Sequence, residues 1–128
     1  MYFTDGKRYE GDWKNDKREG KGILYYKYGT KYEGDYKNGL KNGKGIFYYI
    51  NGEIYDGDCK DGKKEGRGLY KYINGSIYEG EFKKNVRDGK GIIYYINGDR
   101  EMGDYLNDKK NGKHVKLLAN GEVETNEY

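Results

Sequence analysis

The stretch YEGDWKNDKREGKGI at residues 9–23 decides the fold, because it recurs along the chain with a constant step of 23 residues. Repeats have to be sought before secondary structure is assigned, since they determine the architecture. The step holds without a slip in several columns of the sequence. These are Tyr9, Tyr32, Tyr55 and Tyr78; Gly11, Gly34, Gly57, Gly80 and Gly103; Trp13, Tyr36, Cys59, Phe82 and Tyr105; and Gly22, Gly45, Gly68 and Gly91, with His114 as the fifth member.

Each 23-residue unit is predicted to form one β-hairpin. In residues 9–14 the residues Tyr, Gly and Trp alternate with Glu, Asp and Lys, which is the period of a strand. Residues 15–20 are polar and predict a turn, and the equivalent segments contain Asn38-Gly39 and Asp61-Gly62, a strong hairpin signal. Residues 22–26 are β-branched and aromatic and predict the second strand.

The predicted fold is all-β, an elongated single-layer antiparallel ribbon of stacked β-hairpins. An isolated hairpin is marginal in water, so each unit has to bury its aromatic side chains against its neighbours. We expect Gly11, between Tyr9 and Trp13, to leave bare backbone on which an aromatic ring from an adjacent strand lies. The sequence leaves open which ring covers which glycine.

Composition sets the broad class. Of 128 residues, 37% are charged and 34% hydrophobic, and 17 are Tyr, which leaves little for one central core. The single Cys59 excludes an internal disulfide and favours a reducing compartment. No apolar stretch approaches the roughly 20 residues of a membrane span, and residues 1–9 lack a signal peptide's apolar block. We expect a cytoplasmic protein, with association with the cytoskeleton or a membrane as further options.

The unit at residues 9–23 closely resembles the MORN (membrane occupation and recognition nexus) repeat. The resemblance implies an elongated twisted β-ribbon with a trough-like aromatic face. It also implies a scaffold role in cytoskeletal, ciliary or junctional assemblies, or an accessory array beside lipid-kinase or methyltransferase domains. Lipid binding, self-association and binding of partner helices have been attributed to the family.

The resemblance implies that residues 1–128 form a single array of repeat units. We expect a half unit at 1–8, units at 9–31, 32–54, 55–77 and 78–100, a divergent unit at 101–123 and a fragment at 124–128. In the divergent unit Glu101 replaces the opening Tyr and His114 replaces a Gly. Terminal repeats of arrays usually diverge, so this unit is predicted to be a cap.

Motifs for catalysis or cofactor binding are missing, and we expect a protein that is not an enzyme and needs no cofactor. Ser76, His114 and Cys59 are each the only residue of their type, and Cys59 stands in a column of rings where it fills core volume. A metal site would need more His or Cys ligands. The paired carboxylates, such as Glu10 and Asp12, recur in every good unit and therefore indicate a fold device.

Two surfaces are candidates for binding. The predicted turn windows 16–21, 39–44, 62–67, 85–90 and 108–113 hold 13 basic and five acidic residues. The basic residues form a predicted edge for anionic lipid or an acidic partner, unless they only keep the ribbon soluble. Nucleic acid is not expected, because rows of carboxylates would face its phosphates. The basic residues are Lys17, Arg18, Lys21, Lys41, Lys44, Lys63, Lys64, Arg67, Arg87, Lys90, Lys109, Lys110 and Lys113.

The second candidate surface is aromatic. Adjacent tyrosines in a strand point to opposite faces, and a single-layer ribbon cannot bury both. Exposed rows of Tyr are typical of a groove for a partner segment, although packing between repeats would explain them equally well. The predicted trough residues are Tyr25, Tyr26, Tyr48, Tyr49, Tyr70, Tyr72, Tyr94 and Tyr95.

We therefore expect a non-enzymatic scaffold or adaptor whose trough takes a peptide or helix of another protein, or a second copy of the chain. One alternative is a peripheral membrane module that binds phosphoinositides through the basic edge. Another is an accessory array that regulates a lipid kinase or other enzyme on a separate chain.

Overall fold

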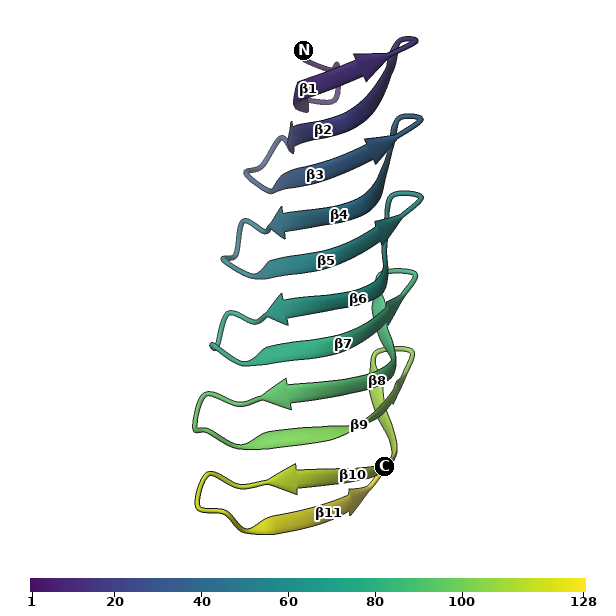
Figure 1. Ribbon diagram of the computed structural model, residues 1–128. Coiled ribbons are helices and arrows are strands. Elements are labelled where there is room, and N and C mark those ends of the chain that lie inside the picture. The colour runs from purple at the N-terminus through teal and green to yellow at the C-terminus, as the bar shows by residue number, and fades with distance from the viewer.

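The computed structural model describes residues 1–128 and contains one antiparallel sheet of eleven strands in sequence order (Figure 1). The predicted fold class is confirmed: the molecule is all-β, with hairpins stacked side by side in one layer. The strands are β1 (Arg8–Lys14), β2 (Lys17–Tyr25), β3 (Lys31–Lys37), β4 (Leu40–Tyr48), β5 (Ile54–Lys60), β6 (Lys63–Lys71), β7 (Ile77–Lys83), β8 (Val86–Tyr94), β9 (Arg100–Leu106), β10 (Lys109–Leu117) and β11 (Val123–Glu127).

The hairpin turns are shorter than the sequence predicted. Residues 15–20 were expected to form the turn, but only Asn15 and Asp16 lie between β1 and β2. Both have left-handed φ angles, 52° and 62°, as a two-residue type I′ turn requires. Asn and Asp tolerate this conformation well, so the chain reverses within two residues and the strand resumes at Lys17.

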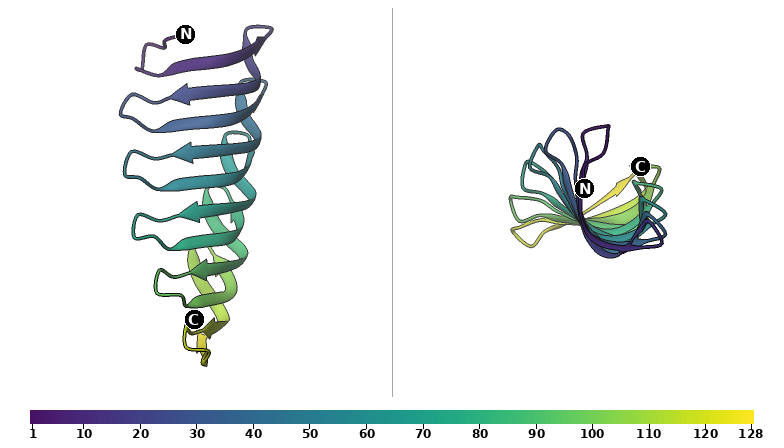
Figure 2. Two further views of the ribbon diagram at one scale, coloured as in Figure 1. Left: turned by 60° about the vertical axis from the view of Figure 1, so that its left-hand side comes forward. Right: turned by 90° about the horizontal axis from the view of Figure 1, so that it is seen from above.

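Each hairpin contains an irregularity at its middle. Gly11 pairs with Gly22, and the next pair is Trp13 with Arg18, so β2 uses two more residues than β1 over the same interval. The Asp12 carboxylate accepts a hydrogen bond from the backbone N–H of Lys21 at 3.2 Å and so satisfies a group in the bulged segment. Bulges bend and twist strands. Figure 2 shows the result, a ribbon whose strands curve into a trough and whose hairpins fan around the long axis.

The other end of each hairpin connects to the next unit through a five-residue loop. In the first loop the backbone N–H of Tyr26 donates to the Thr30 carbonyl at 2.8 Å, and Gly29 donates back to Tyr26 at 3.3 Å. The same pair of bonds recurs in every later loop, for example between Tyr49, Gly52 and Glu53. The loops therefore repeat as faithfully as the strands.

Successive hairpins are also tied together at their turns. The backbone N–H of Gly39 donates to the carbonyl of Arg18 in the preceding hairpin at 2.9 Å, and Gly62 does the same to Lys41 at 2.9 Å. At the amino-terminal edge the backbone of Met1 bonds to that of Tyr9 in both directions. No hairpin stands alone, which is how a repeat array obtains its stability.

Candidate protein-interaction face

The two faces of the sheet differ in chemistry. The ring face carries the side chains of Tyr9, Tyr32, Tyr55 and Tyr78, each 1% exposed or less. The opposite face carries their sequence neighbours, such as Glu10, which is exposed. This separation follows from the alternation of side chains along a strand. The core of the molecule lies on the ring face.

The rings are seated on glycines, but the ring at Gly11 belongs to Tyr9 of the same strand, whereas the sequence had predicted a ring from an adjacent strand. A Cβ atom added to Gly22 would stand 2.2 Å from the hydroxyl oxygen of Tyr9, so no other residue fits there. The ring belongs to the strand of Gly11 and reaches across to Gly22 on the partner strand, which answers the question the sequence left open. The Tyr9 hydroxyl then donates to the carbonyl of Asp12 at 2.9 Å. Tyr32, Tyr55 and Tyr78 repeat both features.

The buried rings form a ladder along the trough. Tyr36 stands edge-on between Tyr9 and Tyr32, with ring centroids 5.3 Å and 5.4 Å away. Further along, Phe82 stands in the same way between Tyr55 and Tyr78, at 5.0 Å and 5.2 Å. Edge-to-face pairs add stability beyond the area they bury. The ladder is interrupted at Cys59, which occupies a ring position and is buried.

A second aromatic row lies on the ring face beside this ladder. Its members Tyr26, Tyr49, Tyr72 and Tyr95 are half-buried, and their rings pack against the core. Tyr49, for example, stacks on Phe47 with centroids 5.8 Å apart. A hollow of 390 Å³ opens at the first of these rings, and its lining includes Tyr26, Phe47 and Tyr49. We call Tyr26, Tyr49, Tyr72 and Tyr95 the tyrosine row.

The eight tyrosines predicted as a trough do not share one face. Tyr26, Tyr49, Tyr70, Tyr72 and Tyr95 belong to the ring face, where Tyr70 packs 4.9 Å from Tyr72. The other three, Tyr25, Tyr48 and Tyr94, lie on the opposite face in register with Arg8, Lys31 and Ile77. There the guanidinium of Arg8 lies 4.0 Å from the centre of the Tyr25 ring, and the ammonium of Lys31 lies 4.7 Å from that of Tyr48.

The thirteen basic residues predicted as one edge are spread over three places. Three are exposed at or beside the hairpin turns, five lie on the opposite face, and five lie on the ring face above the aromatic rings. We call the last group the cation row. The turn residues are Lys17, Lys63 and Lys109; the opposite-face residues are Lys21, Lys44, Arg67, Lys90 and Lys113; and the cation row is Arg18, Lys41, Lys64, Arg87 and Lys110.

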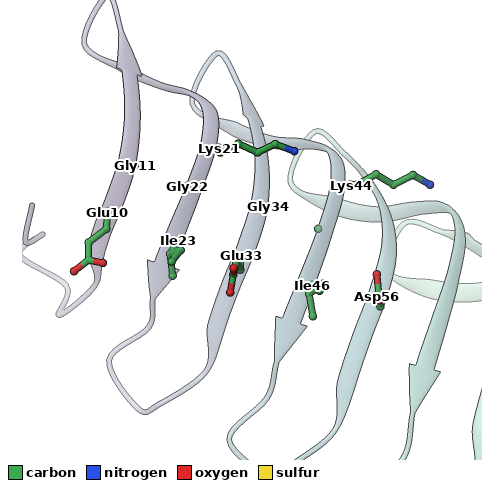
Figure 3. A pocket seen from close by; sticks show the side chains of 11 residues that line it. Glu10, Gly11, Lys21, Gly22, Ile23, Glu33, Gly34, Lys44, Ile46 and Asp56 are labelled. Carbon is green, nitrogen blue, oxygen red and sulfur yellow. The ribbon is translucent and has the colours of Figure 1, made fainter.

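Three of the five basic residues of the opposite face lie within 4.0 Å of a carboxylate. Lys21 forms an ion pair with Asp35, and Lys44 forms one with Asp58. These contacts, with a hydrogen bond from the backbone, hold the pKa of both carboxyl groups below the ordinary value. Beside them lies a hollow of 590 Å³ that crosses strands β1 to β4 and reaches Asp56 of β5. Figure 3 shows carboxylates of Glu10, Glu33 and Asp56 alternating there with Ile23 and Ile46.

The last hairpin replaces the tyrosine ring by the ring of His114 within a network of polar side chains. Glu101 and His114 are almost fully buried, and the His114 Nδ1 atom lies 2.9 Å from the Glu101 carboxylate. Lys110 contacts the same carboxylate at 3.2 Å, and the Tyr128 hydroxyl donates to it at 3.1 Å. Sequence reasoning missed this network. The signal was present, because Tyr and Gly of the repeat are replaced together by Glu101 and His114.

The remaining reactive groups are isolated. Burial raises the pKa of the Cys59 thiol to about 11, so the thiolate that acts as a nucleophile is scarce at neutral pH. No group of three or more His, Cys, Asp or Glu side chains could hold a metal ion. The structure also has no helix that is long and apolar enough to cross a membrane.

These features define a repeat protein built from one-layered β-hairpins. The MORN repeat model matches residues 9–31, 32–54, 55–77 and 78–100, and the chain therefore belongs to the MORN repeat family. No curated protein matches the chain.

Two solved structures have a similar fold. One is the TCP domain of Drosophila melanogaster SAS-4 in complex with a proline-rich motif of Ana2, with 18% identity and a TM-score of 0.62 over 93% of this chain. The match covers 63% of that domain, so the chain spans less than two thirds of its length. The other is the TCP10c domain of Drosophila melanogaster Sas-4, with 17% identity and a TM-score of 0.51 over 95% of this chain and 99% of that one. At these identities the likeness concerns the fold.

Proposed function

We propose that this chain is a non-enzymatic scaffold or adaptor that holds an extended segment of another protein against its ring face. The observation that carries this proposal is the tyrosine row, in which four half-buried rings follow one another at the same place in successive repeats. Tyr offers a large apolar contact area with a polar tip and is enriched at protein interfaces. The hollow of 390 Å³ beside Tyr26 and Tyr49 offers a place for an apolar side chain of the partner.

Two comparisons support this proposal. Membership of the MORN repeat family is in keeping with a scaffold role. The SAS-4 domain of similar fold was solved in complex with a proline-rich motif of Ana2, which supports a peptide as the kind of partner proposed here. Proline-rich segments adopt a stiff extended helix that docks on aromatic side chains at a low cost in entropy. In the proposed complex, an extended segment of the partner lies on the tyrosine row.

The divergent unit 101–123 is proposed to close the array. Its buried Glu101 and His114 and the ring of Tyr128 cover the end of the ring ladder, where the His114 ring lies 4.9 Å from that of Tyr128. Polar groups at this end discourage stacking of another aromatic unit. The binding face would then comprise the units from residue 9 to residue 100.

The test compares two double variants that differ by face. Tyr49→Ala with Tyr72→Ala removes two members of the tyrosine row, whereas Tyr48→Ala with Tyr94→Ala removes two tyrosines of the opposite face. Each is used as bait in cell extract, and bound proteins are identified by mass spectrometry after thermal unfolding has shown that both baits are folded. Loss of the same captured protein from the ring-face variant alone supports the proposal. Equal capture by the unaltered protein and by both variants would exclude the ring face.

A membrane role is the second candidate, because Lys17, Lys63 and Lys109 are exposed at or beside hairpin turns along one side of the ribbon. Each basic residue near an anionic membrane contributes roughly 1 kcal/mol. Co-sedimentation with phosphoinositide-containing and neutral vesicles at about 0.15 M salt decides between the two candidates. Binding that needs anionic lipid and is abolished by Lys17→Glu with Lys63→Glu would place the protein at a membrane surface instead.

A further inference from the structure

The cation row runs along the ring face with one member per hairpin. Each cation lies over aromatic rings at distances typical of cation–π contacts. The side chain of Lys41 is 5.3 Å from the centre of the Tyr32 ring, and that of Lys64 is 5.1 Å from the Tyr49 ring. The guanidinium of Arg18 is 5.2 Å from the Tyr36 ring. The row therefore lies beside the tyrosine row on the same face.

Two members of the row have a carboxylate partner within the chain. Arg87 pairs with Asp108 at 2.7 Å, and Lys110 pairs with Glu101 at 3.2 Å. Arg18, Lys41 and Lys64 have no carboxylate oxygen within 4.0 Å. The amino-terminal half of the row thus carries positive charge without a carboxylate in direct contact; the Glu53 carboxylate, hydrogen-bonded to Tyr70, acts on Lys64 from a greater distance.

These three cations are also half-buried. Burial and the charge of Arg18 lower the pKa of Lys41 to about 8, and burial lowers the pKa of Lys64 below its ordinary value. A half-buried ammonium group without a carboxylate is costly, and a carboxylate brought to it would recover part of that cost. A flat lipid surface is a poorer match, because these cations lie against rings within the trough.

We propose that Arg18, Lys41 and Lys64 bind the carboxylates of an acidic, extended peptide segment, with one carboxylate for each hairpin. This inference rests on the proposed function and adds the chemistry of the partner. Two strands of about 4.8 Å each separate equivalent residues of successive hairpins by roughly 10 Å. In a polyproline II helix, every third residue faces the same way with a repeat of about 9 Å. Acidic residues at every third position would therefore follow the row.

The test measures binding of fluorescein-labelled (Glu-Pro-Pro)₅ by fluorescence anisotropy at about 0.05 M and 0.15 M salt. Two peptides with the same label serve as controls. The first, (Gln-Pro-Pro)₅, has no charged side chain. The second has the composition of (Glu-Pro-Pro)₅ but carries its five Glu residues in one block, so their spacing is wrong. We expect the regularly spaced acidic peptide to bind at least about tenfold more tightly than either, as two or three ion pairs provide. Equal binding of the three peptides, or no binding of any, would overturn the inference.

A matched pair of variants then locates the site. Lys41→Met with Lys64→Met removes two charges but keeps the aliphatic stems that cover the rings. Lys21→Met with Lys44→Met removes the same charge from the opposite face. We expect a loss of about tenfold for the first pair and little change for the second. Equal losses would show that only net charge matters and would overturn the inference.

Failure of this inference can be told from failure of the proposed function. If the Tyr49→Ala and Tyr72→Ala bait loses its partner while the acidic peptide does not bind, the ring face still binds protein and only the acidic chemistry is wrong. If the ring-face and opposite-face baits capture the same proteins, the proposed function fails and this inference fails with it.

Discussion

The Nε2 atom of His114 lies 2.8 Å from the carbonyl oxygen of Asp104, where the other hairpins place a tyrosine hydroxyl. The His114 ring also occupies the space over Gly103, since a Cβ there would stand 2.4 Å from the ring. In the last hairpin the ring thus comes from the second strand instead of the first. Glu101, at the position of the missing Tyr, contacts the other ring nitrogen.

The replacement of the repeat's Tyr and Gly by Glu101 and His114 predicts that the two positions are strongly coupled in their effect on stability. His114→Gly alone leaves the buried Glu101 without one partner and opens space, and we expect it to cost about 3 kcal/mol of unfolding free energy. Glu101→Tyr alone forces two rings into one space and should cost about 2 kcal/mol or more. The double variant restores the Tyr and Gly of the other repeats, so most of the loss should be recovered in urea unfolding. Strictly additive losses would contradict the exchange.

The buried Glu101 should make the unfolding free energy depend on pH in the acidic range. Burial alone would raise the pKa of Glu101, but contacts with Lys110, Tyr128 and His114 lower it below 4.5. A group whose pKa is lower in the folded state stabilises the protein above its unfolded pKa, and this contribution disappears as the pH falls through the folded value. Glu101→Gln should therefore lose about 2 kcal/mol at pH 7, and the difference from the unaltered protein should shrink below about pH 4.

The glycines under the rings should tolerate no side chain. A Cβ at Gly45 would lie 2.3 Å from the Tyr32 ring, so Gly45→Ala should destabilise the protein by about 3 kcal/mol. Gly52→Ala is the control, because nothing lies within 4 Å of its Cβ position and only its φ of +94° costs energy, about 1 kcal/mol. Thermal unfolding of both variants measures the difference. Equal losses would mean that the ring does not rest on the glycine.

Removal of the Tyr36 hydroxyl and removal of the Tyr32 hydroxyl should have opposite effects on stability. The Tyr36 hydroxyl is buried and has no hydrogen-bond partner, whereas the Tyr32 hydroxyl donates to the Asp35 carbonyl at 2.9 Å. Tyr36→Phe should raise the unfolding free energy by about 1 kcal/mol, and Tyr32→Phe should lower it by a similar amount. Denaturant unfolding of the two variants tests this, and a loss of stability in both would contradict the assignment.

The repeat made the fold predictable, but the position of each side chain depended on local geometry. Columns with a step of 23 residues and the alternation around Tyr9 were sufficient for hairpins, strands and ring-over-glycine packing. The bulge was not readable, because its extra residues look like part of the polar turn. It places Arg18 on the ring face and Lys21 on the opposite face, so the cation row cannot be predicted from a turn over residues 15–20.

The candidate site was predictable in part for a similar reason. Tyr48 and Tyr49 had to point to opposite faces, but the sequence could not say which of them faced the core. The pairing of Tyr48 with Lys31 and the stacking of Tyr49 on Phe47 decide this. The network of Glu101 with Lys110 and Tyr128 joins residues from three strands or strand ends, which is a tertiary arrangement that no single repeat contains.

Photo-cross-linking from adjacent positions tests the central claim most directly. Tyr49 on the ring face and Tyr48 on the opposite face are each replaced in cells by p-benzoylphenylalanine, which keeps an aromatic ring at the site. After irradiation, adducts are identified by mass spectrometry. The account predicts a protein adduct from position 49 that is missing from position 48. An adduct from position 48 alone, or equal adducts from both, would contradict a binding site on the ring face.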